Sequence, residues 1–178
     1  ILFTSGIVAF ISIPIWWIIS NRLGKKITWL ISSTITLSSL ILFYFYDIKT
    51  LHELLFLVAF IGFGSGAGGI LFWSMLPDTI EYGEVHSGVR SESSLYGFMT
   101  FAQKGSIAIA VLILGWVLDA IGYQANQVMS AATVDNMKTI MTLIPILGIS
   151  CSLIIIYFYP IDSKMHKDLL RQLQKEAI

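Results

Sequence analysis

Five long stretches of almost uncharged sequence restrict the possible folds of this chain more than any other feature. Asp, Glu, Lys, Arg and His are absent from residues 1–20, 27–46, 54–77 and 139–161, and residues 93–118 contain only Lys104. A helix needs about 20 apolar residues to cross a bilayer. The stretches lack the alternation of apolar and polar residues that is typical of membrane barrel strands. The sequence therefore predicts an all-α membrane protein with five transmembrane helices.

The composition and the beginning of the chain agree with this prediction. Charged residues make up 12% of the sequence, whereas soluble domains have about 25%. The first stretch begins at residue 1 without an initiator Met, a basic segment or a cleavage site, so it is interpreted as a span and not as a signal peptide. An odd number of spans suggests a fragment of a longer protein.

The distribution of lysine and arginine predicts the orientation of the spans. One side of the membrane would hold eight of these residues, which are Arg22, Lys25, Lys26, Arg90, Lys164, Lys167, Arg171 and Lys175. The other side would hold Lys49 and Lys138. Because basic loops stay in the cytoplasm, we expect a multi-pass protein of the plasma membrane, with residue 1 outside the cell and the tail inside.

The tail, residues 162–178, has the spacing of an amphipathic helix. Its apolar residues fall near one face, and they are Met165, Leu169, Leu170 and Leu173. Ser163 is the expected N-cap. Such a helix binds the inner surface of a membrane, and a frayed, solvated tail is the alternative.

The segment between the third and fourth spans, residues 78–92, is rich in charge. Pro77 is expected to end the third span, which makes this segment a loop on the cytoplasmic side. Together with one cation of the first loop, its charges are predicted to form a gate network of Asp78, Glu81, Glu84, Arg90 and Arg22. The network would hold one conformation of a moving protein closed, and a solvated polar loop is the alternative.

The third span contains Gly64-Ser-Gly66-Ala-Gly-Gly69, which matches the pattern GxGxxG. A nucleotide site of this kind needs a preceding strand and a helix that begins at the glycines, whereas these glycines lie inside an apolar stretch. We therefore interpret the pairs Gly62/Gly66 and Gly64/Gly68 as positions where helices pack closely. A bending segment in a moving helix is the alternative.

The sequence has no constellation that hydrolysis or metal chemistry would need. His52, His86 and His166 fall in three separate loops or tails, and HExxH, CxxC and P-loop patterns are absent. Cys151 is the single cysteine, so it forms no disulfide within the chain. We expect no enzyme activity, metal site, cofactor or nucleic-acid partner.

Lys104 is the one charge inside a predicted span, roughly 18 Å along its helix. An unpaired cation there costs at least about 2.5–3.5 kcal/mol. Tyr96, Thr100 and Lys104 recur every four residues, and Gln103 lies beside them. A polar stripe of this kind predicts a water-filled cavity, and its donors suit a polyhydroxylated substrate. The alternative is a structural ion pair, but no predicted span contains an acid to form one.

The sequence MLPDTIEYGEVHSGVRSESSLYGFMTFAQKGSIAIA resembles the motif of the glycoside–pentoside–hexuronide:cation symporters, the group that contains the melibiose permease. The positions that match are Asp78, Glu81, Tyr82, Gly83, Glu84, Arg90, Glu92, Tyr96 and Lys104. The ending YPIDSKMHKDLLRQLQ is also similar to the end of that family. The resemblance runs across the whole chain.

This resemblance implies a major facilitator fold of twelve helices in two halves, of which the five spans would be helices eight to twelve. It implies that Lys104 lines the sugar cavity near the cation site, with Thr100 one turn away. The coupling cation, Na⁺ or H⁺, would be bound mainly by the N-terminal half, which the chain would need as its partner. Trp73 lies in the helix that carries a sugar-stacking tryptophan in the family, but its spacing from Asp78 does not support that role.

The expected function is sugar:cation symport by alternating access, in a protein that contacts sugar, cation and lipid bilayer. A major facilitator carrier of another solute, such as a lipid or an organic anion, is the first alternative. A membrane sensor or scaffold without transport activity is the second.

Overall fold

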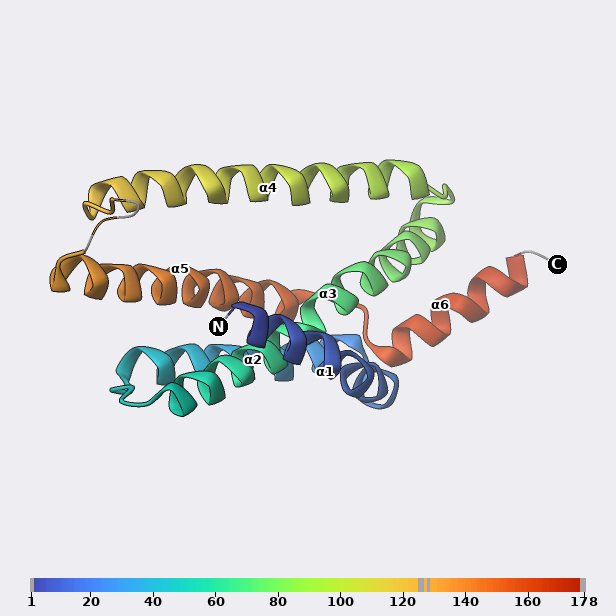
Figure 1. Ribbon diagram of the computed structural model, residues 1–178. Coiled ribbons are helices and arrows are strands. Elements are labelled where there is room, and N and C mark those ends of the chain that lie inside the picture. Colours follow the sequence, from blue (N-terminus) through green and yellow to red (C-terminus); the bar gives the residue numbers. More distant parts are fainter. Residues whose placement is uncertain (1, 125–126, 128, 177–178) are drawn as a thin grey trace.

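The computed structural model of the protein describes residues 2–124, 127 and 129–176. These residues form six helices, which are α1 (Leu2–Leu23), α2 (Lys25–Phe45), α3 (Leu51–Ser87), α4 (Glu92–Ala120), α5 (Ala131–Phe158) and α6 (Ser163–Glu176) (Figure 1). Ile1, in the first predicted span, and Ala177 and Ile178, in the predicted tail, lie outside the described residues.

The helices α1 to α5 are each long and apolar enough to cross a membrane. The described part of the chain contains no strand. Both observations confirm the prediction of an all-α protein with five spans. The tail is helical as well, but Ser163 is not its cap, because the Asp162 carboxylate accepts the N–H groups of Lys164 and Met165 at 3.1 and 2.7 Å.

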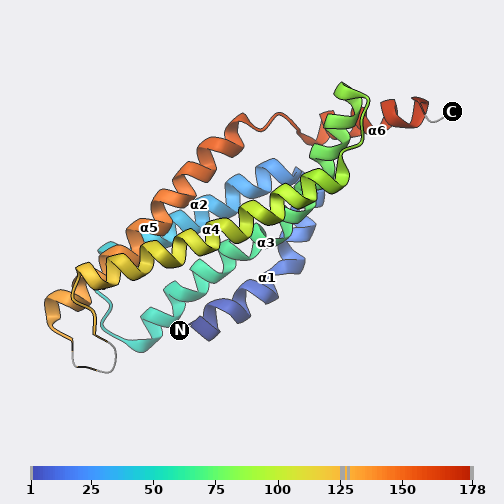
Figure 2. The same ribbon diagram turned by 90° about the horizontal axis from the view of Figure 1, so that it is seen from above.

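Four of the helices pack in the order α1, α3, α2 and α5, so that α3 lies between α1 and α2 (Figures 1 and 2). The core of this layer contains Trp16, Ala67 and Leu71, which are almost fully buried. The Trp16 indole donates a hydrogen bond to the Phe63 carbonyl at 2.7 Å. This bond satisfies the one polar atom of the largest buried side chain.

Glycines on α3 permit this close packing. A Cβ atom on Gly62 would lie 2.9 Å from the Ser5 Cα of α1, and one on Gly64 would lie 2.9 Å from the Thr36 N of α2. Gly66 likewise faces Ala9, 3.2 Å from its Cα atom. The packing interpretation is therefore correct at these positions, whereas Gly68 has open space and does not fit it.

We expect Gly62→Ala to lower the free energy of unfolding by about 1–3 kcal/mol, the usual effect of overpacking. The added methyl group would meet the backbone of α1, which cannot rotate away as a side chain can. Unfolding in mixed micelles, followed by circular dichroism, measures the change. Gly68→Ala is the matched control and should leave stability unchanged or slightly higher, because alanine favours helix more than glycine. Equal losses in both variants would contradict the packing argument.

Lys26 joins two neighbouring helices of the layer, α2 and α5. Its ammonium group donates hydrogen bonds to the carbonyl oxygens of Tyr157 and Tyr159 at 2.9 and 2.7 Å, at the C-terminus of α5. These carbonyls have no partner within the helix, and a cation there also offsets the negative end of the helix dipole. The contact fixes the start of α2 against the end of α5.

The helix α4 stands apart from this layer. Figure 1 shows it as a separate rod above α5, connected to α3 at one end. None of its residues is buried. Both of its faces are therefore available for substrate, lipid or other polypeptide.

Candidate functional site

The charged segment after Pro77 is part of a helix. The helix α3 passes through Pro77 and ends at Ser87, so the expectation of a loop from residue 78 is wrong. Gly88 ends the helix with a φ of 70°, a left-handed conformation that glycine adopts easily. The acids therefore have fixed directions on one rigid element.

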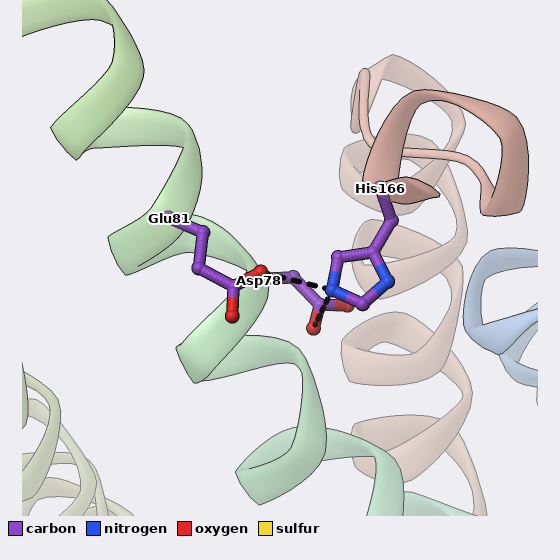
Figure 3. Close-up of side chains that lie close together, drawn as sticks. All are labelled: Asp78, Glu81 and His166. Atoms are coloured by element: carbon purple, nitrogen blue, oxygen red, sulfur yellow. Dashed lines mark hydrogen bonds and ion pairs between the residues drawn. The ribbon is translucent and has the colours of Figure 1, made fainter. Parts of the chain in front are cut away.

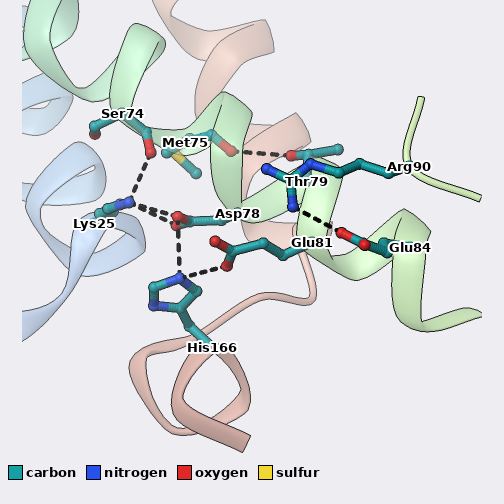
Figure 4. A network of polar contacts seen from close by, with 9 residues as sticks. All are labelled: Lys25, Ser74, Met75, Asp78, Thr79, Glu81, Glu84, Arg90 and His166. Atoms are coloured by element: carbon teal, nitrogen blue, oxygen red, sulfur yellow. Dashed lines mark hydrogen bonds and ion pairs between the residues drawn. The ribbon is translucent and has the colours of Figure 1, made fainter. Parts of the chain in front are cut away.

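Polar side chains support the turn that contains Pro77. The Lys25 ammonium donates to the Ser74 carbonyl at 2.6 Å, and the Thr79 hydroxyl donates to the Met75 carbonyl at 3.0 Å (Figure 4). Proline lacks an N–H group and crowds the preceding turn, which disturbs the helical hydrogen bonds there. The two side-chain donors stabilise this turn and allow α3 to continue.

Lys25 and Asp78 form a largely buried ion pair. The ammonium lies 2.6 and 2.8 Å from the two carboxylate oxygens of Asp78. The Asp78 side chain is 7% exposed and that of Lys25 is 30% exposed. The pair connects the first residue of α2 to the first acid of the charged part of α3.

His166 brings α6 to the same place. Its Nε2 atom lies 2.9 Å from a Glu81 oxygen and 3.4 Å from an Asp78 oxygen (Figure 3). Asp78 and Glu81 are three residues apart on α3, so their side chains lie on one face of the helix. Leu169, one turn after His166, is buried and adds an apolar contact to the polar one. These contacts hold the beginning of α6.

A second group of charges lies further along the chain and is more exposed. Arg90 pairs with Glu84 at 2.9 Å and with Glu92 at 3.2 Å, and its side chain is 54% exposed. The hydrogen bonds to Glu92 and Glu84 raise the pKa of the Arg90 guanidinium. Surface pairs of this kind contribute little to stability.

Four of the five residues predicted for the gate network fall in two groups of ion pairs, which are Lys25–Asp78–Glu81–His166 and Glu84–Arg90–Glu92. Arg22 belongs to neither, since it is exposed and forms no ion pair with any residue that the structure describes. The first group connects α2, α3 and α6. Its ion pairs hold these three helices of the chain together.

The polar stripe predicted on the fourth span is carried by α4. The Thr100 hydroxyl donates to the Tyr96 carbonyl at 2.8 Å, which leaves an oxygen lone pair of Thr100 available. Lys104 is exposed, and no acid of residues 2–124, 127 and 129–176 pairs with it. Lys104 therefore presents a free ammonium group near the middle of a helix of 29 residues.

Gln103 faces a groove of about 510 Å³ between α3 and α4. The lining residues are Trp29, Gly68, Gly69, Phe72, Trp73, Met99, Ala102, Gln103 and Ser106. Trp73 is 42% exposed, so part of its ring surface is free. Aromatic surface beside amide and hydroxyl groups is a combination that suits a sugar ring.

Comparison with known proteins shows which family this sequence fits. The model of a family described as "MFS/sugar transport protein" matches residues 1–163. The chain belongs to this family. The match confirms the resemblance drawn from the motif, and the expectation that the chain is not an enzyme, because the family consists of transport proteins.

Relatives in this family are named after different solutes. A glucuronide carrier protein homolog of Escherichia coli K12 is 32% identical over 149 residues, which are 84% of this chain and 33% of the relative. A putative 2,3-dihydroxypropane-1-sulfonate exporter of Salmonella typhimurium is 33% identical over 86% of this chain and 34% of its own. An isoprimeverose transporter of Lactiplantibacillus pentosus is 34% identical over 68% of this chain and 25% of its own. The chain thus spans about a third of the length of these relatives.

Two positions were not expected from the sequence. They are the contact of His166 with Asp78 and Glu81, and the place of Trp73 in a groove beside Gln103. A signal for Trp73 was present, since it lies in the helix whose glycines leave room for a groove. No local signal relates His166 to Glu81, which is 85 residues away.

Proposed function

We propose that the chain is the C-terminal part of a sugar:cation symporter that works by alternating access. Membership of the family of sugar transport proteins supports this proposal. The observation that carries it is Lys104, which presents a free cation beside hydroxyl and amide groups on the exposed helix α4. A permanent ammonium in a membrane span is costly unless it faces water, substrate or an acid.

In this proposal, the substrate binds between α4 and the remaining part of the transporter. Lys104 donates hydrogen bonds to sugar oxygens or neighbours the acids of the cation site. Tyr96, Thr100 and Gln103 contribute donors and acceptors along the same side. The coupling cation, Na⁺ or H⁺, is bound mainly by residues outside this chain, in an N-terminal half that rocks against it around a midplane site.

We also propose that the charged end of the bundle lies in the cytoplasm of a cell whose plasma membrane holds the protein. The start of α2, the end of α3 and the start of α6 meet there, on the side to which the sequence assigns eight of the eleven Lys and Arg residues. Arg22 is exposed at that end, and so is Arg90 with its partners Glu84 and Glu92, so these residues can contact the other half. Such contacts would bias the protein toward the inward-closed state.

A carrier of organic anions is the second candidate. One relative is named a sulfonate exporter, and a free ammonium at Lys104 is a suitable partner for a sulfonate or a carboxylate. The direction of net movement would then follow the solute gradient and not a cation gradient.

Accumulation in vesicles tests the proposal. The complete protein is reconstituted with labelled neutral disaccharide, glucuronide or short sulfonate outside, and a Na⁺ or H⁺ gradient is imposed. We expect one of the sugars to accumulate above its external concentration, and we expect collapse of the cation gradient to abolish this accumulation.

Three other results would contradict symport of a sugar. Accumulation of the sulfonate alone would favour the organic-anion carrier. Equilibration without accumulation would remove cation coupling. Binding of a sugar without any movement across the membrane would favour a sensor or scaffold. Protein-free vesicles and vesicles without a gradient are the controls.

A further inference from the structure

The meeting point of α3 and α6 has the donor atoms of a metal site. Asp78, Glu81 and His166 each present one ligand atom, and the three atoms lie within 4.8 Å of one another (Figure 3). Two of the ligands come from one helical face and the third comes from a separate element. Imidazole nitrogen combined with carboxylate oxygen is a ligand set that zinc and related divalent ions bind.

The spacing of these atoms is close to what a metal ion requires. Metal–ligand bonds of about 2.0–2.2 Å at tetrahedral angles place two ligand atoms about 3.3–3.6 Å apart. The His166 nitrogen is 2.9 Å from the Glu81 oxygen and 3.4 Å from the Asp78 oxygen. All three atoms lie within 4.8 Å of one another, so an ion between them would take the place of the proton that His166 and Glu81 share.

Charge and burial favour a divalent ion at this place. The group that contains the three ligands has two acids, Asp78 and Glu81, and one permanent cation, Lys25. With neutral His166, this group has a charge of −1, which attracts a cation. The side chains of His166, Glu81 and Asp78 are 29%, 20% and 7% exposed. Water therefore reaches the site and can complete the coordination.

Lys25 does not block the site. It occupies one lone pair on each Asp78 oxygen, and a carboxylate has about four such positions. Its ammonium group repels a second cation and so limits the affinity. The same contact fixes the orientation of the Asp78 carboxylate, as second-shell groups do for metal ligands.

From this geometry we propose that Asp78, Glu81 and His166 form a site for one divalent ion such as Zn²⁺, and that the ion fastens α6 to α3. The site is separate from the polar stripe of Lys104 and does not depend on the transported solute. Metal binding would hold the start of the tail helix in place at the cytoplasmic end of the bundle.

Co²⁺ and Zn²⁺ alone are the probes for this proposal. The complete protein in lipid nanodiscs is titrated with Co²⁺, and we expect one saturable set of visible absorption bands that Zn²⁺ displaces. His166→Ala should weaken binding by at least about 10- to 100-fold, the range that even loss of a second-shell group causes. Glu81→Gln preserves side-chain size and should also weaken binding. Zn²⁺ should slow amide hydrogen exchange in α6 of the parent but not of His166→Ala.

His86→Ala is the matched control, because it removes a histidine that stacks on Tyr82 and lies outside the proposed ligand set. It should bind Co²⁺ like the parent. Absence of saturable binding in the parent would overturn the proposal. Equal affinity in the parent, His166→Ala and Glu81→Gln would assign the metal to another place and would overturn it as well.

Discussion

Lys104→Ala should lower coupled uptake by about 10- to 150-fold, which corresponds to the 1.5–3 kcal/mol of a hydrogen bond to a charged group. The reason is that Lys104 is exposed on α4, where no described acid pairs with it, and in the proposed mechanism its partner is the solute or a group of the cation site. Initial rates of uptake in vesicles, at matched protein content, measure the effect. Folding should be preserved, because the change removes an uncompensated charge from a span.

Two variants sharpen this test. Lys104→Arg retains the charge but changes its shape, and it should retain more uptake than Lys104→Ala if charge is the main contribution. Lys138→Ala makes the same substitution near the start of α5, and it should leave uptake unchanged. Normal uptake by Lys104→Ala would remove this residue from the mechanism. A similar loss in Lys138→Ala would indicate a general effect of lost charge.

Lys25→Met should lower the free energy of unfolding by about 2–4 kcal/mol. Loss of one partner from a fully buried ion pair costs about 3–5 kcal/mol, and the 30% exposure of Lys25 reduces this value. The substitution leaves the Asp78 carboxylate, which is 7% exposed, without its cation. It also removes the donor that supports the Ser74 carbonyl next to Pro77. Unfolding in mixed micelles, followed by circular dichroism, measures the change.

The double variant Lys25→Met/Asp78→Leu separates the pair from the individual residues. Replacement of both charges by apolar groups is often nearly neutral, so the double variant should recover much of the stability lost by Lys25→Met. A double variant as unstable as the sum of the two single variants would show that the ion pair has no coupling energy.

The spans and the position of Lys104 inside one of them could be predicted from the sequence, because each charged residue in a membrane span has an energetic cost. The end of α3 could not be predicted in this way. Pro77 followed by acids is a local pattern for a helix end, and the bonds that overrule it come from Lys25, which lies 49 residues from Ser74 in the chain. Contacts between residues so far apart in the chain leave no periodic pattern in the sequence.

Which residues form each group of ion pairs also depends on tertiary contacts. Lys25 and Arg22 both lie between the first two spans, and only the packing of α2 on α3 decides that Lys25 is the partner of Asp78. The contact of His166 with Asp78 and Glu81 could not be predicted either, because it depends on the direction that α6 takes after α5. Trp73 and Gln103 share a groove only because α4 passes over the glycines of α3.

The continuation of α3 through Pro77 has a mechanical consequence. A helix of 37 residues is about 55 Å long, and the hydrocarbon core of a bilayer is only about 30 Å thick. The acids on its last turns therefore lie beyond the hydrocarbon region, on a lever arm that is rigidly joined to the spanning part. A tilt of about 10° moves the end of a rod of this length by roughly 10 Å. Small rotations inside the membrane are thus amplified where Asp78, Glu81 and Glu84 contact Lys25, His166 and Arg90.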